Sequence, residues 1–270
     1  MLIDFHTHAF PDAIADRAIQ RLEGISKHTA LTRGTVGELR EQMKRSGVDI
    51  SVICSIATNA KQTTNVNNFA IETNSKYGDI YPLGSVFPDG SDEFIESELR
   101  RIHKAGLRGI KIHPDYIGRY INEPCYDVIW RVCSELGLFV ISHSGVDFYS
   151  PDDVHCTPEM VLDVTTRYPD LKFIAAHAGG LDMYDDVERY IVGKPIWIDL
   201  SLFTIGKITP EQARRIIINH DPSRMVFGSD NPWNDPADEK RYIEQLSLPD
   251  ELLERICWKN AADLLGEKKI

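Results

Sequence analysis

The sequence predicts an α/β protein folded as a single (β/α)₈ barrel, a TIM barrel, on three observations. Eight short apolar segments rich in β-branched residues alternate with segments of helical period. Such alternation gives parallel strands joined by right-handed helical crossovers. The length of 270 residues suits one closed barrel. An open, doubly wound sheet would carry a glycine-rich turn after its first strand, where this chain has His6-Thr7-His8.

The first half of the chain sets up the alternation. Residues 1–8 are predicted as a strand, and residues 11–24 as a helix because their apolar side chains recur with the helical period. Thr35 caps the second helix, since Glu38 can complete a capping box and Gly47 can end the helix. Further strands are predicted at 48–56, 80–86 and 107–113, with helices at 65–77 and 92–105.

The second half continues the same pattern. Strands are predicted at 138–143, 171–177, 195–200 and 224–229, and helices at 123–136, 158–168, 181–192, 210–220, 236–246 and 249–265. No linker, low-complexity segment or short-period repeat interrupts the sequence. Residues 1–270 are therefore predicted to form one domain.

Composition and charge narrow the class of function. Hydrophobic residues make up 42% of the chain, and the formal net charge is -11, which argues against nucleic acid or an anionic membrane as a partner. The five cysteines contain no C-x-x-C pair and indicate scattered thiols in a reducing compartment. We expect no signal peptide before the first strand, and no apolar run approaches the ~20 residues of a membrane span. We expect a cytoplasmic protein with a small-molecule substrate. The sequence leaves open whether the protein forms a homo-oligomer.

The first strand carries two histidines that could bind a metal. Side chains alternate between the faces of a strand, so His6 and His8 project the same way. Two neutral imidazoles at this spacing can close on one zinc ion or a similar metal. A histidine-rich surface turn is the alternative, because H-x-H is common by chance.

Later strands end in further candidate ligands. His143, His177 and Asp230 follow the predicted fifth, sixth and eighth strands. In a barrel the C-terminal ends of the strands converge on one face, where barrel enzymes place their active sites. Such a polar cluster would be costly to bury without a metal or mutual pairing.

These strand ends together resemble the amidohydrolase superfamily, most closely its amidohydrolase-2 branch of short, metal-dependent barrel hydrolases, which also contains non-oxidative decarboxylases. The resemblance runs the whole length of the chain and is carried by His143 and by Asp4-Phe5-His6-Thr7-His8, Gly109-Ile110-Lys111-Ile112-His113-Pro114, His177-Ala178-Gly179-Gly180, Gly228-Ser229-Asp230-Asn231-Pro232 and Asn260-Ala261-Ala262-Asp263-Leu264-Leu265-Gly266.

The resemblance implies a site with one divalent metal ion, zinc or alternatively manganese. Its ligands would be His6, His8, His143 and Asp230. His177 would be a catalytic histidine that does not ligate the metal and that polarises the substrate or moves a proton. A metal with an open coordination position lowers the pKa of bound water toward ~7 and polarises a carbonyl group. Asp230 could then accept the proton of that water.

Lys111 and His113 on the fourth strand leave alternatives open. Superfamily members with two metals often bridge them with a carboxylated lysine at this place, which would make Lys111 a ligand. In the branch resembled most closely, one metal is the rule, and the lysine is an ordinary cation. It would then pair with a buried carboxylate such as Asp4 or bind a substrate anion. His113 either faces the site or supports it from behind.

Loops after the strands are expected to set specificity. Arg119 together with Lys111 would suit a carboxylate-bearing substrate, and Trp233 follows the eighth strand. The alternative is that Arg119 is solvated and that the aromatic side chains only pack.

The expected function is metal-dependent hydrolysis of a small carbonyl compound such as a lactone, amide or ester. The alternative is non-oxidative decarboxylation of an unsaturated or aromatic carboxylic acid, a carbon–carbon lyase reaction that would use the same ligands. A third hypothesis, a binding protein on a barrel scaffold, does not require a positioned acid and base such as His177 and Asp230.

Overall fold

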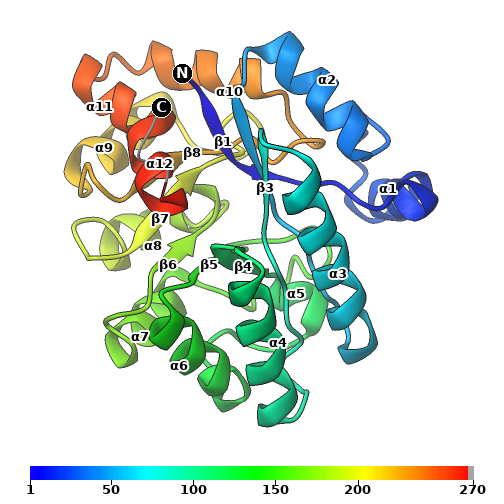
Figure 1. The fold of residues 1–270 in the computed structure, drawn as a ribbon. Helices are drawn as coiled ribbons and strands as arrows, with labels where there is room; N and C mark the ends of the chain where they lie inside the picture. Colours follow the sequence, from blue (N-terminus) through cyan, green and yellow to red (C-terminus); the bar gives the residue numbers. More distant parts are fainter. Residues whose placement is uncertain (267–270) are drawn as a thin grey trace.

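Eight short parallel strands form the centre of the molecule in the computed structural model, which describes residues 1–266 (Figure 1). All of them lie within the predicted segments and are shorter than predicted. They are β1 (Ile3–Thr7), β2 (Ile50–Ile53), β3 (Ile80–Pro82), β4 (Gly109–Ile112), β5 (Phe139–Ser142), β6 (Phe173–Ala175), β7 (Trp197–Leu200) and β8 (Met225–Phe227).

The strands close into a barrel through two short seams. Strands β1 to β3 pair in order, and so do β4 to β8. One seam joins Gly84, just after β3, to Ile110 of β4; the other joins Thr7 of β1 to Asn231, just after β8. In the first seam, the backbone N–H of Lys111 donates to the carbonyl of Gly84 at 2.9 Å. The predicted (β/α)₈ fold is therefore confirmed.

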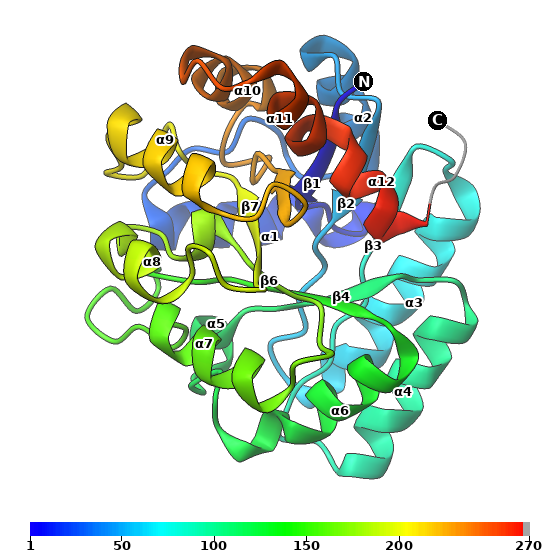
Figure 2. The same cartoon turned by 90° about the vertical axis from the view of Figure 1, so that its left-hand side faces the viewer.

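Helices surround this barrel on the outside (Figures 1 and 2). The α-helices are α1 (Asp12–Ser26), α2 (Val36–Ser46), α3 (Ala60–Lys76), α4 (Asp92–Lys104), α5 (Pro114–Ile117), α6 (Asp127–Leu136), α7 (Pro158–Arg167), α8 (Tyr184–Tyr190), α9 (Pro210–Asn219), α10 (Pro236–Gln245), α11 (Asp250–Glu254) and α12 (Asn260–Leu265). Short 3₁₀ turns occupy Pro124–Tyr126 and His177–Gly179, and a π-helical segment, Arg255–Lys259, links α11 to α12. None of the helices within residues 1–266 combines the length and apolarity needed to cross a membrane.

Local sequence signals explain where several helices begin and end. The predicted capping box is present at α2, where the Thr35 side chain accepts from the backbone N–H of Glu38 and Glu38 bonds back to Thr35. Gly47 ends the helix with φ 69°, a left-handed conformation that glycine adopts without strain. Helix α3 begins earlier than predicted, because the Asn59 side chain accepts from the N–H of Gln62 and caps it.

Helices α12 and α1 lie on opposite sides of the barrel (Figure 1). Ala261 and Leu265 of α12 belong to the same apolar cluster as Ile3 and Phe5 of β1, which fill the barrel interior. Helix α1, by contrast, contributes to the lining of the cavity that also contains His6 and Asp230. The barrel is thus packed at one end and open to a cavity at the other, where its strands end.

Candidate active site

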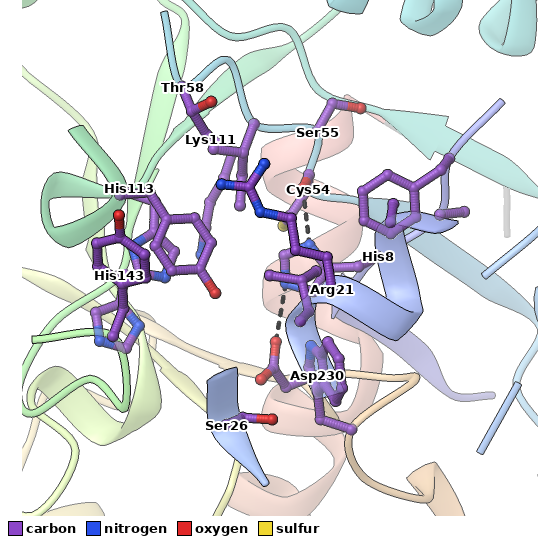
Figure 3. Close-up of a pocket in the computed structure, with 18 of the residues that line it drawn as sticks. His8, Arg21, Ser26, Cys54, Ser55, Thr58, Lys111, His113, His143 and Asp230 are labelled. Carbon is purple, nitrogen blue, oxygen red and sulfur yellow. Dashed lines mark hydrogen bonds and ion pairs between the residues drawn. The ribbon is translucent and has the colours of Figure 1, made fainter. Parts of the chain in front are cut away.

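A cavity of about 640 Å³ lies over the C-terminal ends of the strands (Figure 3). Its polar floor comes from several strands, and α1 and the loops after β2, β4, β5 and β7 supply a largely apolar wall. Of the residues predicted to form the site, those in this lining are His6, His8, Lys111, His113, His143, His177, Asp230 and Trp233.

Three of the four predicted metal ligands lie together. Oδ1 of Asp230 lies 2.9 Å from Nε2 of His8 and 3.3 Å from Nε2 of His6. The seam between β1 and the segment after β8 produces this approach: the N–H of Asp230 donates to the carbonyl of His6 at 2.8 Å, and the N–H of His8 donates to the carbonyl of Asn231 at 2.6 Å. Asp230 has φ 67°, a conformation unfavourable for a non-glycine residue, which these neighbouring bonds hold in place.

The other nitrogen of each histidine is held from behind. Nδ1 of His6 lies 2.9 Å from Oδ2 of Asp199, and Nδ1 of His8 lies 2.9 Å from the carbonyl oxygen of Cys54. Both acceptors favour a ring proton on Nδ1, so that Nε2 of each ring would present its lone pair to a metal ion beside Asp230. Sequence reasoning missed Asp199, although an aspartate inside the apolar segment Trp197–Leu200 was a visible signal.

His177 connects this group to His143. Nε2 of His177 lies 3.1 Å from Nδ1 of His143, and its Nδ1 lies 2.8 Å from the hydroxyl of Ser201. The His177 ring also stacks on that of His6, with centroids 5.1 Å apart. His143 is thus separated from His6 by one imidazole and does not join the group formed by His6, His8 and Asp230.

His143 also faces two buried carboxylates that the sequence did not single out. Its Nε2 has no hydrogen-bond partner and lies 3.8 Å from Oδ2 of Asp147 and 4.0 Å from Oδ2 of Asp115. His113 stacks on the His143 ring, with centroids 4.3 Å apart. These separations exceed hydrogen-bond length, so His143 retains a nitrogen available to a ligand.

Lys111 does not pair with Asp4. Its Nζ lies 2.8 Å from Nε2 of His6, and the side chain is buried. The Asp4 carboxylate instead accepts from the backbone N–H of Ser229 at 2.9 Å and from the Ser229 hydroxyl. The alternative in which Lys111 pairs with Asp4 is therefore wrong, because the neighbouring strand end already satisfies the carboxylate.

The substrate-binding residues expected from the sequence divide into two groups. Lys111, His113 and Trp233 line the cavity, whereas Arg119 is not part of that lining. The Arg119 guanidinium lies 3.2 Å from Asp89 and 3.5 Å from Glu123. This corrects the expectation for Arg119, whose charge is neutralised near the surface instead of facing the cavity.

The donor set fits a divalent metal ion. Burial and the nearby Lys111 ammonium hold the pKa of His6 well below its usual range, so this imidazole stays neutral, as ligation requires. Burial also lowers the pKa of His177. Burial opposes ionisation of Asp230, but His6, His8 and Lys111 offset it and leave the pKa below its ordinary value. Two imidazole nitrogens and a carboxylate oxygen within 4.8 Å of one another form the arrangement that zinc and manganese bind.

Solved structures with the same fold cover nearly the whole chain. An uncharacterized TIM-barrel protein from Bordetella bronchiseptica is 16% identical, with a TM-score of 0.78 and 98% of each chain covered. A 5-carboxyvanillate decarboxylase from Novosphingobium aromaticivorans, in complex with manganese, is 17% identical, with a TM-score of 0.73, over 98% of this chain and 96% of its own. A protein from Pseudomonas putida, assigned as a 2-pyrone-4,6-dicarboxylic acid hydrolase, is 14% identical, with a TM-score of 0.69, over 100% and 98%.

At these sequence identities the comparison shows a shared fold and does not assign the activities of these proteins to this chain. None of the curated proteins compared with the chain matches it. The family model for amidohydrolases matches residues 3–266, almost the entire chain. The protein is therefore a member of the amidohydrolase-2 family.

Proposed function

We propose that the protein is a metal-dependent hydrolase of a small carbonyl compound, a lactone, amide or ester that also bears a carboxylate. The observation that carries this proposal is the convergence of His6, His8 and Asp230 at the floor of a cavity of small-molecule size. The family is dependent on divalent metals, and one neighbour of the same fold contains manganese.

One divalent ion, zinc or alternatively manganese, would be held by His6, His8 and Asp230. His143, the predicted fourth ligand, is separated from these three by His177; its Nε2, which has no hydrogen-bond partner, would join them only if the side chain turned toward the ion. When bound, the ion would supply Lewis acidity, lowering the pKa of a water molecule and polarising the substrate carbonyl. The Asp199 carboxylate behind His6 would keep that ring oriented and strengthen it as a donor.

Asp230 and His177 are assigned to proton transfer. Asp230 remains ionised and can accept a proton in the cavity. His177 is neutral, and its Nδ1 is anchored on Ser201; its Nε2 would exchange the contact with His143 for a substrate oxygen, which it would polarise, or for a proton that it would move. Lys111 is assigned as an uncarboxylated cation, because its amine donates to His6. A metal on Nε2 of His6 would release the N–H groups of Lys111 for a substrate oxygen.

Decarboxylation of an aromatic or unsaturated acid is the second candidate. The apolar cavity wall includes Phe69, Tyr116, Phe148 and Trp233, which suit a flat, unsaturated substrate. The enzyme from Novosphingobium aromaticivorans that shares this fold is a 5-carboxyvanillate decarboxylase. Both reactions would use the same ligands, so the product distinguishes them.

A substrate screen in ¹⁸O-labelled water separates the two reactions. The zinc- and manganese-loaded protein would be offered carboxylate-bearing lactones, amides and esters, and aromatic and unsaturated diacids. A hydrolase gives product that contains one solvent oxygen and releases no carbon dioxide. Release of one equivalent of carbon dioxide, with no ¹⁸O in the organic product, would show decarboxylation instead of hydrolysis. Absence of turnover with either metal across the screen would count against both.

A further inference from the structure

Helix α1 presents two arginines to the cavity. Arg17 and Arg21 lie four residues apart and therefore on the same side of the helix. Both are among the residues that line the cavity, although each is also exposed to solvent. In Figure 3, Arg21 extends from the α1 ribbon into the group of side chains that includes His8 and Lys111.

Neither arginine has an acidic partner within residues 1–266. The nearest acids along α1 are engaged elsewhere: Arg33 lies 3.3 Å from Glu23 and 3.6 Å from Asp16, and Gln20 donates to Asp16 at 2.8 Å. In a chain of net charge -11 that pairs most of its arginines with carboxylates or carbonyls, two free guanidinium groups beside one cavity are unusual. They leave up to ten N–H donors available to a ligand.

The wall near these arginines is apolar. Ile14, Ala18 and Leu22 of α1 also line the cavity, together with Phe69 and Trp233 from other parts of the chain. The floor contains the proposed metal ligands. A molecule that fills this space would meet Lewis acidity at the floor, hydrocarbon along the wall and positive charge at α1.

We propose that Arg17 and Arg21 form a carboxylate-binding site that holds one end of the substrate while its other end reacts at the metal site. The substrate then has an apolar, unsaturated or aromatic body with a carboxylate remote from the reacting group. For the hydrolase this is a carboxylate-bearing lactone, amide or ester; for the lyase it is a dicarboxylic acid. The proposal rests on the proposed function for the location of the reacting group.

The donor geometry of arginine suits a carboxylate. The guanidinium group is planar and binds the two oxygens of a carboxylate side by side. A bond of this kind to a charged group strengthens binding by up to roughly a hundredfold outside water. Because Arg17 and Arg21 are also exposed to solvent, which screens their charge, we expect about tenfold. Arg17 and Arg21 are thus positioned to determine specificity, and neither is assigned to the chemical step.

Binding of simple probes tests this site without turnover. The affinities of benzoate, isophthalate and terephthalate for the zinc-loaded protein would be measured by calorimetry. One carboxylate of each probe can occupy the metal site, and only the diacids can reach the arginines as well. We expect at least one diacid to bind tenfold or more tightly than benzoate, and the Arg17→Gln/Arg21→Gln variant to lose that preference.

Matched variants make the test specific. Arg33→Gln and Arg119→Gln each remove the same charge from an arginine that is paired with acids, and both should retain the preference for the diacid. Arg17→Lys/Arg21→Lys keeps the charge without the planar donors and should retain only part of the preference for the diacid. Unchanged preference in the folded glutamine variant, or equal loss in Arg119→Gln, would overturn the assignment.

The test of the carboxylate site and the test of the proposed reaction can fail independently of each other. His6→Ala/His8→Ala is expected to lose metal and turnover, yet Arg17 and Arg21 remain in this variant and should still bind terephthalate more tightly than the arginine-free variant does. If the arginines bind the diacid and the substrate screen fails, the proposed reaction is wrong and the carboxylate site stands. If turnover is found and the arginine substitutions leave KM unchanged, the carboxylate site is wrong.

Discussion

At the scale of single residues, Asp199 illustrates how an interaction behind the ligands supports the site. Its carboxylate lies 2.9 Å from Nδ1 of His6 and also accepts the backbone N–H of His177 at 3.1 Å. We predict that Asp199→Asn lowers metal affinity by roughly 10–100-fold, because the amide holds the His6 ring less firmly and makes it a weaker donor.

Chelator competition measures this affinity directly. Glu41→Gln, a substitution of an exposed acid on α2, is the control and should bind metal like the unmodified protein. An Asp199→Asn variant with unaltered metal affinity would remove the supporting role assigned to this carboxylate.

Asp230 and His177 are expected to respond differently to substitution. Asp230→Asn should reduce turnover by roughly 10²–10⁴-fold, or further if metal is lost, since an amide cannot act as a base. His177→Asn should also reduce turnover but leave metal content nearly unchanged, because its nitrogens bind His143 and Ser201 instead of the metal.

Metal counts made beside the rates decide between one ion and two. If Lys111 were carboxylated and bridged two ions, His177→Asn and Lys111→Ala would each release about one of two equivalents. Near-normal turnover in Asp230→Asn would contradict the mechanism whatever the metal content.

The sequence predicted part of this site for identifiable reasons. His6, His8 and Asp230 stand at strand ends, and strand-end residues converge in any barrel. Asp199 lies inside an apolar strand segment, where no periodicity marks it as polar and functional. The absence of a Lys111–Asp4 pair could not be predicted, because Asp4 is bound by Ser229 after β8. Only closure of the barrel brings that strand end next to β1.

At the scale of elements, His220 joins the end of α9 to the segment before β7. Its Nε2 donates to the carbonyl of Ile196 at 2.9 Å, and its Nδ1 accepts the N–H of Gly193 at 3.3 Å. Burial lowers the pKa of this imidazole below its ordinary value of 6.5. Protonation would remove the acceptor that Gly193 uses.

This histidine should make the fold less stable in mild acid. Below pH 6.5 the unfolded chain binds a proton that the folded chain excludes, so the free energy of unfolding falls as pH falls, by up to about 1.4 kcal/mol per pH unit. His220→Gln should abolish this part of the slope in denaturant titrations between pH 7 and 5, whereas His103→Gln, at an exposed histidine of α4, should not. An unchanged slope in His220→Gln would refute the linkage.

Element boundaries were predictable where capping chemistry is local. Thr35, the predicted cap of α2, accepts a backbone N–H three residues ahead, and Ser91 and Thr209 do the same at α4 and α9. The helical period identified the apolar side of α1, but it could not predict that Arg17 and Arg21 line the cavity, because that depends on the whole fold. Similarly, apolar spacing alone could not reveal the π-helical segment before α12.

At the scale of the whole molecule, the two seams that close the barrel also build the site. The seam at Thr7 and Asn231 brings the first and last strands together and thereby places Asp230 beside His6 and His8. Ligands more than 220 residues apart in sequence depend on closure of the complete barrel. Metal binding should therefore stabilise the folded protein as a unit.

The central claim, one divalent metal held at the ends of β1 and β8, is tested most directly by counting metal in purified protein and in His6→Ala/His8→Ala. Elemental analysis should find close to one equivalent of zinc or manganese in the unmodified protein. The double variant, checked for folding by circular dichroism, should contain almost none, because two of the three converging donors are gone. A folded double variant that retains one equivalent would contradict the assignment of these histidines as ligands.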